Sequence, residues 1–177
     1  MQGSLLVSAR NIGQLTEIND TPADPCQTGG QDMGEERNSH MHARIIVAVD
    51  LAHPDQARAL LGRATQLLDA GGEIRLVHVL EEVPGYLAAE LPADIGQRRR
   101  AEAAVELRAM IDPKLDIRMV HDVRHGAASG QIIQAAEDSG ADLIMIASHK
   151  PGLRDYFIGS TAARVIRHAR CSVLIER

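Results

Sequence analysis

Short runs rich in β-branched residues alternate with stretches of helical periodicity along most of the chain. The apolar runs span 44–50, 73–80, 115–123, 141–148 and 172–176, and the stretches with helical spacing span 54–70, 95–111, 129–139 and 160–169. Runs that are apolar on both faces indicate strands buried between two layers. Strict alternation of strands and helices predicts parallel strand pairing. We therefore predict a Rossmann-like α/β fold, a five-stranded parallel sheet with helices on both faces.

Two local signals set the expected bounds of the first helix. Pro54 suits a first helical turn, because proline lacks the N–H that this turn leaves unpaired anyway. Gly71 and Gly72 are predicted to end the helix, since glycine is the usual residue just past a helix C-terminus. The second strand should then begin at Glu73.

Residues 1–40 differ in composition from the rest of the chain. They hold two basic and six acidic residues, five glycines and two prolines, and show neither helical nor strand periodicity. Such a segment cannot bury enough apolar surface to order itself, so we predict a disordered extension, with the domain at 41–177. It is either the product of an upstream start codon or a cloning remnant, or a partner-binding arm. Its deletion is expected to leave the melting temperature and ligand affinity nearly unchanged.

Composition excludes several classes of function. The net charge of −5 and the aromatic content of 2% argue against binding to nucleic acids or to anionic membranes. Two cysteines without a CxxC pair indicate neither a disulfide framework nor a zinc site. Near the N-terminus only Leu5, Leu6 and Val7 are consecutively apolar, too few for a signal peptide or a membrane span. We expect a cytoplasmic protein.

The residues that follow the strands are the candidates for ligand binding. In open parallel sheets, ligands bind beyond the carboxyl ends of the strands, where the strand order reverses. Asp50 follows the first strand, and a polar loop after the fourth carries Lys150 and leads into Gly159-Ser160-Thr161 at a helix start. Free amides and hydroxyls at a helix N-terminus favour anions, so this loop predicts a phosphate site. The alternatives are that Ser160 merely caps the helix and that Asp50 merely anchors its turn.

The stretch IASHKPGLRDYFIGSTAARVIRHARCSVLIER (146–177) resembles the C-terminal signature of the universal stress protein family, most like its F/G-type bacterial branch. VAVD at the end of the first strand and HVL at 78–80 resemble the family's first two strand ends. The family's usual pattern, G-x2-G-x9-G-[S/T], wraps the ribose and phosphates of ATP. Here Ala147 and Lys150 stand where the first two glycines are usual, and eight residues separate Lys150 from Gly159.

The resemblance implies an adenine nucleotide alpha hydrolase-like fold that binds ATP, or AMP or ADP. Whether Mg²⁺ accompanies the phosphates stays open at this point. By position in the motifs, it assigns the adenine side to Ala48, Asp50 and Val79. It assigns the ribose and phosphate side to Ala147, Ser148, Lys150, Gly159, Ser160 and Thr161, with His149 in the same loop. His149 could face the phosphates or simply pack.

Other polar residues are interpreted as structural. His78 lies inside a strand and is expected to be a hydrogen-bonded core histidine. The run Arg98–Arg100 is expected to be a solvated helix face, because three charges without aromatics rarely form a phosphate track. Cys171 is expected to pack rather than react.

Three functions remain open from the sequence. We favour a nucleotide-binding regulatory protein that acts through conformation or through an unknown protein partner. The alternatives are a weak ATPase or autophosphorylating enzyme, and an interaction module whose pocket has lost its ligand. The sequence lacks the GxxxxGK[ST] phosphate-binding motif, which argues against the ATPase.

A homodimer is also expected. In the family the last strand pairs antiparallel with its copy, and here Val173, Leu174 and Ile175 would supply the apolar contact.

Overall fold

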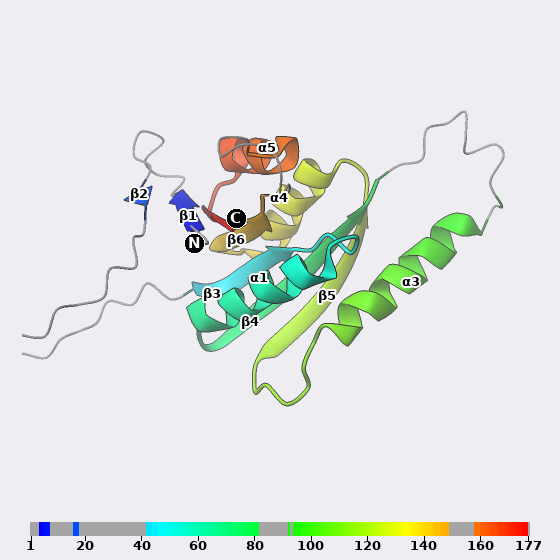
Figure 1. Cartoon of the computed structure of the whole chain (residues 1–177), viewed down its shortest axis with the longest axis horizontal. Coiled ribbons are helices and arrows are strands. Elements are labelled where there is room, and N and C mark those ends of the chain that lie inside the picture. Colours follow the sequence, from blue (N-terminus) through cyan, green and yellow to red (C-terminus); the bar gives the residue numbers. More distant parts are fainter. Residues whose placement is uncertain are drawn as a thin grey trace, which may run out of the picture.

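A computed structural model of the chain describes residues 4–7, 16–17, 42–81, 92, 94–148 and 158–176. Figure 1 shows its elements. In chain order they are β1 (Ser4–Val7), β2 (Thr16–Glu17), β3 (His42–Ala48), α1 (Pro54–Leu67), β4 (Leu68–Leu80), α3 (Ile95–Ala109), β5 (Arg118–His125), α4 (Ala128–Ser139), β6 (Leu143–Ala147), α5 (Ser160–His168) and β7 (Ser172–Glu176).

The strands form one sheet in the order β2-β1-β7-β6-β3-β4-β5. The five strands from β3 onward pair in parallel, which confirms the predicted five-stranded parallel core. The chain moves outward from β3 to β4 and β5 on one side, and then crosses to β6 and β7 on the other. The order therefore reverses between β3 and β6, which places the expected ligand crevice at the carboxyl ends of those two strands.

Helices cover both faces of the sheet, as predicted. In Figure 1, α1 and α3 lie on one side, and α4 and α5 on the other. Successive residues of β3 face opposite layers: Ile45 and Val47 pack with α1 and α3, whereas Ile46 packs with α4 and α5. All three are at most 1% exposed. This two-sided burial explains why the central strands read as continuous apolar runs.

The second strand begins earlier than the sequence predicts. Helix α1 ends at Leu67, and Leu68 already has an extended backbone. Gly71, with a φ of 77°, and Gly72 lie inside β4, where the pairing register with β3 shifts. A Cβ on Gly72 would lie 2.8 Å from the carbonyl oxygen of Ala43. The two glycines thus permit an irregularity of the strand and a close backbone approach, and the prediction that they end the helix was wrong.

The N-terminal extension contributes two strands that were not predicted. β1 pairs antiparallel with β7, and β2 pairs antiparallel with β1. The expectation of an extension without strands is therefore wrong for these six residues; residues 1–3, 8–15 and 18–41 lie outside the described part. Since β1 pairs with the backbone of β7, deletion of the extension is no longer expected to leave stability unchanged.

The same pairing changes the expected edge of the sheet. The last strand was predicted to present a bare edge to a second copy, but here that edge is occupied by the chain's own β1. Figure 1 shows β1 beside the C-terminal strand. Dimerisation through β7 stays a prediction, and it requires β1 to leave this edge.

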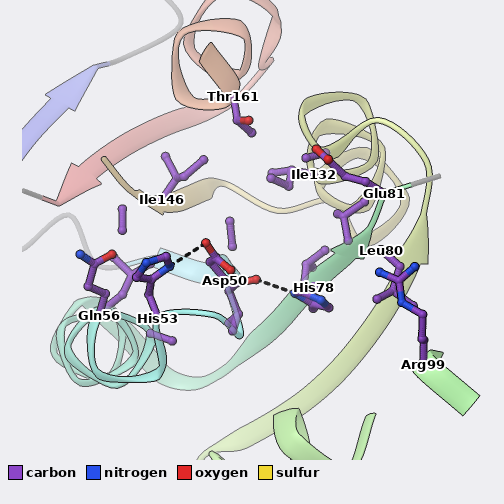
Figure 2. Close-up of a pocket in the computed structure, with 18 residues that line it drawn as sticks. Asp50, His53, Gln56, His78, Leu80, Glu81, Arg99, Ile132, Ile146 and Thr161 are labelled. Atoms are coloured by element: carbon purple, nitrogen blue, oxygen red, sulfur yellow. Dashed lines mark hydrogen bonds and ion pairs between the residues drawn. The ribbon is translucent and has the colours of Figure 1, made fainter. Parts of the chain in front are cut away.

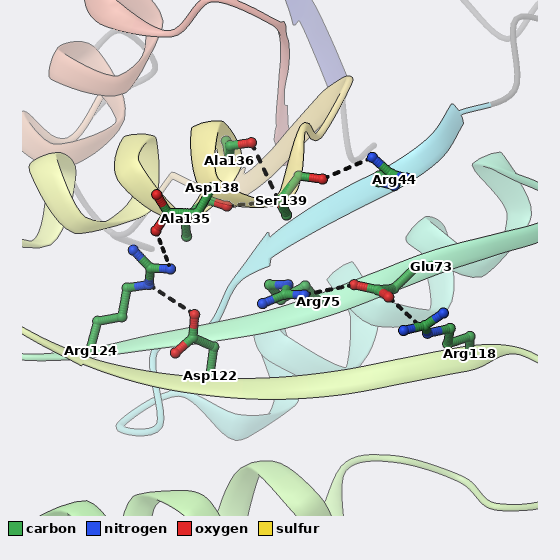
Figure 3. A network of polar contacts seen from close by, with 10 residues as sticks. All are labelled: Arg44, Glu73, Arg75, Arg118, Asp122, Arg124, Ala135, Ala136, Asp138 and Ser139. Carbon is green, nitrogen blue, oxygen red and sulfur yellow. Dashed lines mark hydrogen bonds and ion pairs between the residues drawn. The ribbon is translucent and has the colours of Figure 1, made fainter.

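A polar network ties α4 to the outer strand β5 (Figure 3). Nε of Arg124 donates to Asp122, and Nη2 of Arg124 approaches Asp138 on α4; both separations are 2.8 Å. Hydrogen bonds from Gln134 and from Arg124 hold the pKa of the Asp138 carboxyl below its ordinary value. The network fixes the end of α4 against the sheet, while the start of the same helix lies at the cavity described next.

Candidate functional site

A cavity of about 500 Å³ opens at the carboxyl ends of β3, β4 and β6, at the reversal of strand order. Figure 2 shows the side chains that line it. Its lining comprises Ala48, Val49, Asp50, His53, Gln56, Ala57, Leu60, Val77, His78, Val79, Leu80, Glu81, Arg99, Ala128, Ile132, Ile146, Ala147 and Thr161. The volume lies within the usual range for small-molecule sites, and the mixture of apolar walls with a few polar groups is typical of them.

Asp50 lies in the turn between β3 and α1. Its Oδ1 accepts a hydrogen bond from the N–H of Ala52 at 3.0 Å, and its Oδ2 lies 3.0 Å from Nδ1 of His53. The side chain is nevertheless 60% exposed and lines the cavity. The turn-anchoring role proposed as an alternative is therefore present in the structure. It leaves the carboxylate within reach of a ligand, because each carboxylate oxygen can accept more than one hydrogen bond.

His78 has the hydrogen bond expected of a structural histidine, but it also forms part of the cavity wall. Its Nδ1 lies 2.9 Å from the carbonyl oxygen of Val49. Since a carbonyl only accepts, Nδ1 carries the proton, and Nε2 of the neutral ring is an acceptor. The bond links β4 to the end of β3, the strand that presents Asp50 (Figure 2).

Half of the ten residues assigned from the sequence line this cavity. They are Ala48, Asp50, Val79, Ala147 and Thr161. They come from β3, β4, β6 and α5, so the fold brings together residues that lie more than 100 positions apart in the chain. The strand-end argument predicts this position for Asp50, and the family resemblance assigned Ala48, Val79 and Ala147.

The remaining assigned residues lie beside the cavity or outside the described residues. The N–H of Ser148 donates to the carbonyl of Glu176 at 2.8 Å, so Ser148 continues the β6–β7 pairing. Gly159 is the N-cap of α5, which has no side-chain cap hydrogen bond. Ser160 is the first helical residue, and the alternative that it caps the helix is therefore wrong. His149 and Lys150 lie outside the described residues.

Among the described residues, nothing covers the start of α5. A Cβ built on Gly159 would meet no atom of these residues within 4 Å. The first intrahelical bond runs from the N–H of Ala163 to the carbonyl of Gly159. The N–H groups of the residues before Ala163 therefore take no part in the hydrogen bonds of the helix itself. Thr161, in this first turn, lines the cavity.

Sequence reasoning missed several polar residues of the wall. His53, Gln56, Glu81 and Arg99 all line the cavity. Arg99 belongs to the run interpreted as a solvated face, and that interpretation was wrong for this residue (Figure 2). Its neighbour Arg98 instead pairs with Asp94, with 2.7 Å between Nε and Oδ2. The phase of α3 against the sheet decides this difference, and the local sequence carries no signal for it.

No group of three or more His, Cys, Asp or Glu side chains among the described residues could hold a metal ion. None of the helices in the described part of the chain is both long enough and apolar enough to cross a membrane.

Comparison with known proteins supports the same interpretation of the domain. A family model described as "Universal stress protein family" matches residues 41–177. Universal stress protein G of Escherichia coli O157:H7 is 31% identical over 145 residues, which cover 77% of this chain and 100% of the relative. A universal stress protein of Thermus aquaticus is 30% identical over 144 residues, covering 77% of this chain and 100% of that protein.

Solved structures share the fold. The structure of hypothetical protein MJ0577 has a TM-score of 0.65 at 22% identity and covers 76% of this chain and 95% of its own. Universal stress protein UspA from Lactobacillus plantarum has a TM-score of 0.60 at 20% identity, with coverage of 77% and 99%. At these identities the likeness confirms the arrangement of the sheet and helices.

Proposed function

Because the chain belongs to the universal stress protein family, as the match over residues 41–177 shows, we propose that it is a cytoplasmic regulatory protein that binds an adenine nucleotide. ATP is the proposed ligand. AMP and ADP, which carry fewer phosphates, are the alternatives. The observation that carries the proposal is the cavity at the strand-order reversal, which gathers five residues assigned in advance to a nucleotide site.

The walls of the cavity suit a purine and a ribose. Val79 and Ile146 offer apolar surfaces, and no bulky aromatic ring is among the lining residues. Asp50 presents an exposed carboxylate at one end, which can accept a hydrogen bond from an adenine amine or a ribose hydroxyl. A charged acceptor beside apolar walls provides both affinity and orientation.

The phosphates would lie at the opposite side, against the start of α5. Thr161 faces the cavity from this helix (Figure 2), and no described residue crowds Gly159, where a phosphate would approach the backbone. Lys150 and His149 belong to the adjoining loop and are proposed to add positive charge. Mg²⁺ would enter bound to the phosphates.

We propose regulation rather than catalysis. A ligand that binds one conformation of the cavity better than another shifts the protein toward that conformation, which a protein partner can recognise. A homodimer formed through β7 would require β1 to leave the edge it occupies here.

The first test is direct. Mass spectrometry of small molecules released from freshly purified protein should detect an adenine nucleotide, and calorimetry should give a dissociation constant for ATP of about 1 µM, or about −8 kcal/mol. Lys150→Ala, Ser160→Ala and Thr161→Ala should each weaken binding by about 1–3 kcal/mol.

The matched control is Thr65→Ala. Thr65 donates its hydroxyl to the carbonyl of Gly62 on α1 and does not line the cavity. This variant should bind ATP as the unmodified protein does. If no nucleotide is released and ATP gives no binding heat, the proposal fails, and the alternative of an interaction module without a ligand takes its place.

A further inference from the structure

The edge of β7 is covered by a strand from the opposite end of the chain. Ser4, Leu5, Leu6 and Val7 of β1 pair antiparallel with Glu176, Ile175, Leu174 and Val173, in that order. The other edge of β7 pairs in parallel with β6. β1 is thus a sixth strand added to a five-stranded parallel core that is already complete without it.

β7 belongs to the core by itself. Val173 and Ile175 pack in the layer of α4 and α5, and Leu174 packs in the layer of α1 and α3. All three are at most 3% exposed. A strand fixed in this way keeps its outer backbone N–H and C=O groups in a constant geometry, whether or not β1 is present.

Such an edge attracts another strand. Unpaired backbone groups along an apolar strand are a template for pairing with a second chain. β1 uses these groups in the antiparallel sense, and a second β7 related by a two-fold axis would meet them in the same sense. Both strands cannot occupy one edge at the same time.

The described backbone pairing of β1 is short. β1 has four residues, and on its far side Leu5 and Leu6 are the ones that pair with β2 within the described part of the chain. Residues 8–41, a connection of 34 residues, separate β1 from β3. β1 can therefore leave β7 without disrupting a crossover of the parallel core.

We propose that β1 is an exchangeable cap on β7, which keeps two copies of this chain apart and whose release lets them associate through their β7 edges. Because β1 and β7 belong to one chain, the effective concentration of β1 at the β7 edge is on the order of 1 mM. At about 20 µM protein, β1 is then favoured about 50-fold over a second copy that pairs equally well. The full chain is a monomer at this concentration, and the uncapped chain is a dimer. Neither state depends on the nucleotide proposed above.

The test uses the full chain with Leu5→Pro and Leu6→Pro together. Alternate N–H groups of a strand point to opposite neighbours, so one of the two prolines removes a donor toward β7. Gln31→Pro with Asp32→Pro, outside the described strands, is the matched control. Sedimentation equilibrium at about 20 µM should give the 19.1 kDa chain mass for the unmodified and control proteins, and twice that mass for the β1 variant. If all three are monomers, or all three are dimers, the proposal is wrong.

A cross-link provides the second measurement, and it applies even if the proline variant precipitates. Ser4 and Glu176 are direct partners across the two strands, at a spacing that a disulfide can span. In a chain with Cys26→Ser and Cys171→Ser, the pair Ser4→Cys and Glu176→Cys should oxidise within one chain and fix the monomer. A disulfide that joins two chains, or no disulfide at all, would overturn the proposal.

Discussion

Replacing Asp50 separates its role in the turn from its proposed role in ligand binding. Asp50→Ala removes the acceptor for the N–H of Ala52 and the contact with His53. One such hydrogen bond contributes about 1 kcal/mol, and an ion pair at 60% exposure contributes little more. We expect Asp50→Ala to lower the free energy of unfolding by about 1 kcal/mol, or about 4 °C in melting temperature for a domain of this size. Asp50→Asn retains an acceptor for Ala52 and should cost less than about 0.5 kcal/mol.

Nucleotide affinity should respond differently to the same two variants. If the carboxylate accepts a hydrogen bond from the nucleotide, both variants lose a charge-assisted bond of about 1–3 kcal/mol, a 5- to 150-fold increase in the dissociation constant. Calorimetric titration with ATP measures this change, and urea unfolding measures the stability.

Asp142 offers a matched control at the opposite end of the strands. Its Oδ2 accepts the N–H of Ala43 at 2.9 Å, and its Oδ1 lies 3.3 Å from Nδ1 of His42. Asp142→Ala should therefore cost a similar amount of stability and leave ATP affinity unchanged. Should Asp50→Asn bind ATP as tightly as the unmodified protein does, the reasoning is refuted, and Asp50 only anchors the turn.

Three further predictions follow from burial and hydrogen bonding. Ile144 is 0% exposed at the centre of the sheet, so Ile144→Ala should cost about 2–5 kcal/mol in urea unfolding. Burial raises the pKa of the Cys171 thiol, so in a variant whose other cysteine is serine, iodoacetamide at pH 8 should react far more slowly with the folded than with the urea-unfolded protein. Hydrogen bonds from Gln134 and Arg124 lower the pKa of Asp138 from 3.8, so its stabilising contribution is present above pH 3.8 and is lost as the pH falls through the lower folded value. The melting temperatures of the unmodified protein and Asp138→Asn should therefore differ at pH 7 and converge at acidic pH.

Hydrophobic periodicity by itself determined the parallel core. The runs around Ile46, Leu76 and Ile144 are apolar at consecutive positions because both sheet faces are covered, and that pattern is visible without any tertiary information. The alternation with helices then restricted the connections to parallel crossovers. Local turn chemistry was less decisive: Gly71 and Gly72 fit a helix end and a strand irregularity equally well, and pairing with β3 decided between them.

The candidate site could be predicted in part. Asp50 follows from its place after a strand, because the carboxyl ends of parallel strands meet at one edge, whereas Ala147 was assigned only through the family resemblance. Gln56 and Arg99 could not be found this way, since they reach the cavity through the rotation of α1 and α3 against the sheet. Residues spaced three or four apart share a helix face, but only packing determines which face meets the ligand.

The N-terminal strand is the feature that only the tertiary structure decided. Leu5, Leu6 and Val7 are too few to show a strand period, and the surrounding composition favours disorder. Their partner, β7, lies about 170 residues away along the chain. The pairing forms because β7 offers a fixed row of backbone donors and acceptors, a property of the assembled sheet that no local pattern near residue 5 contains.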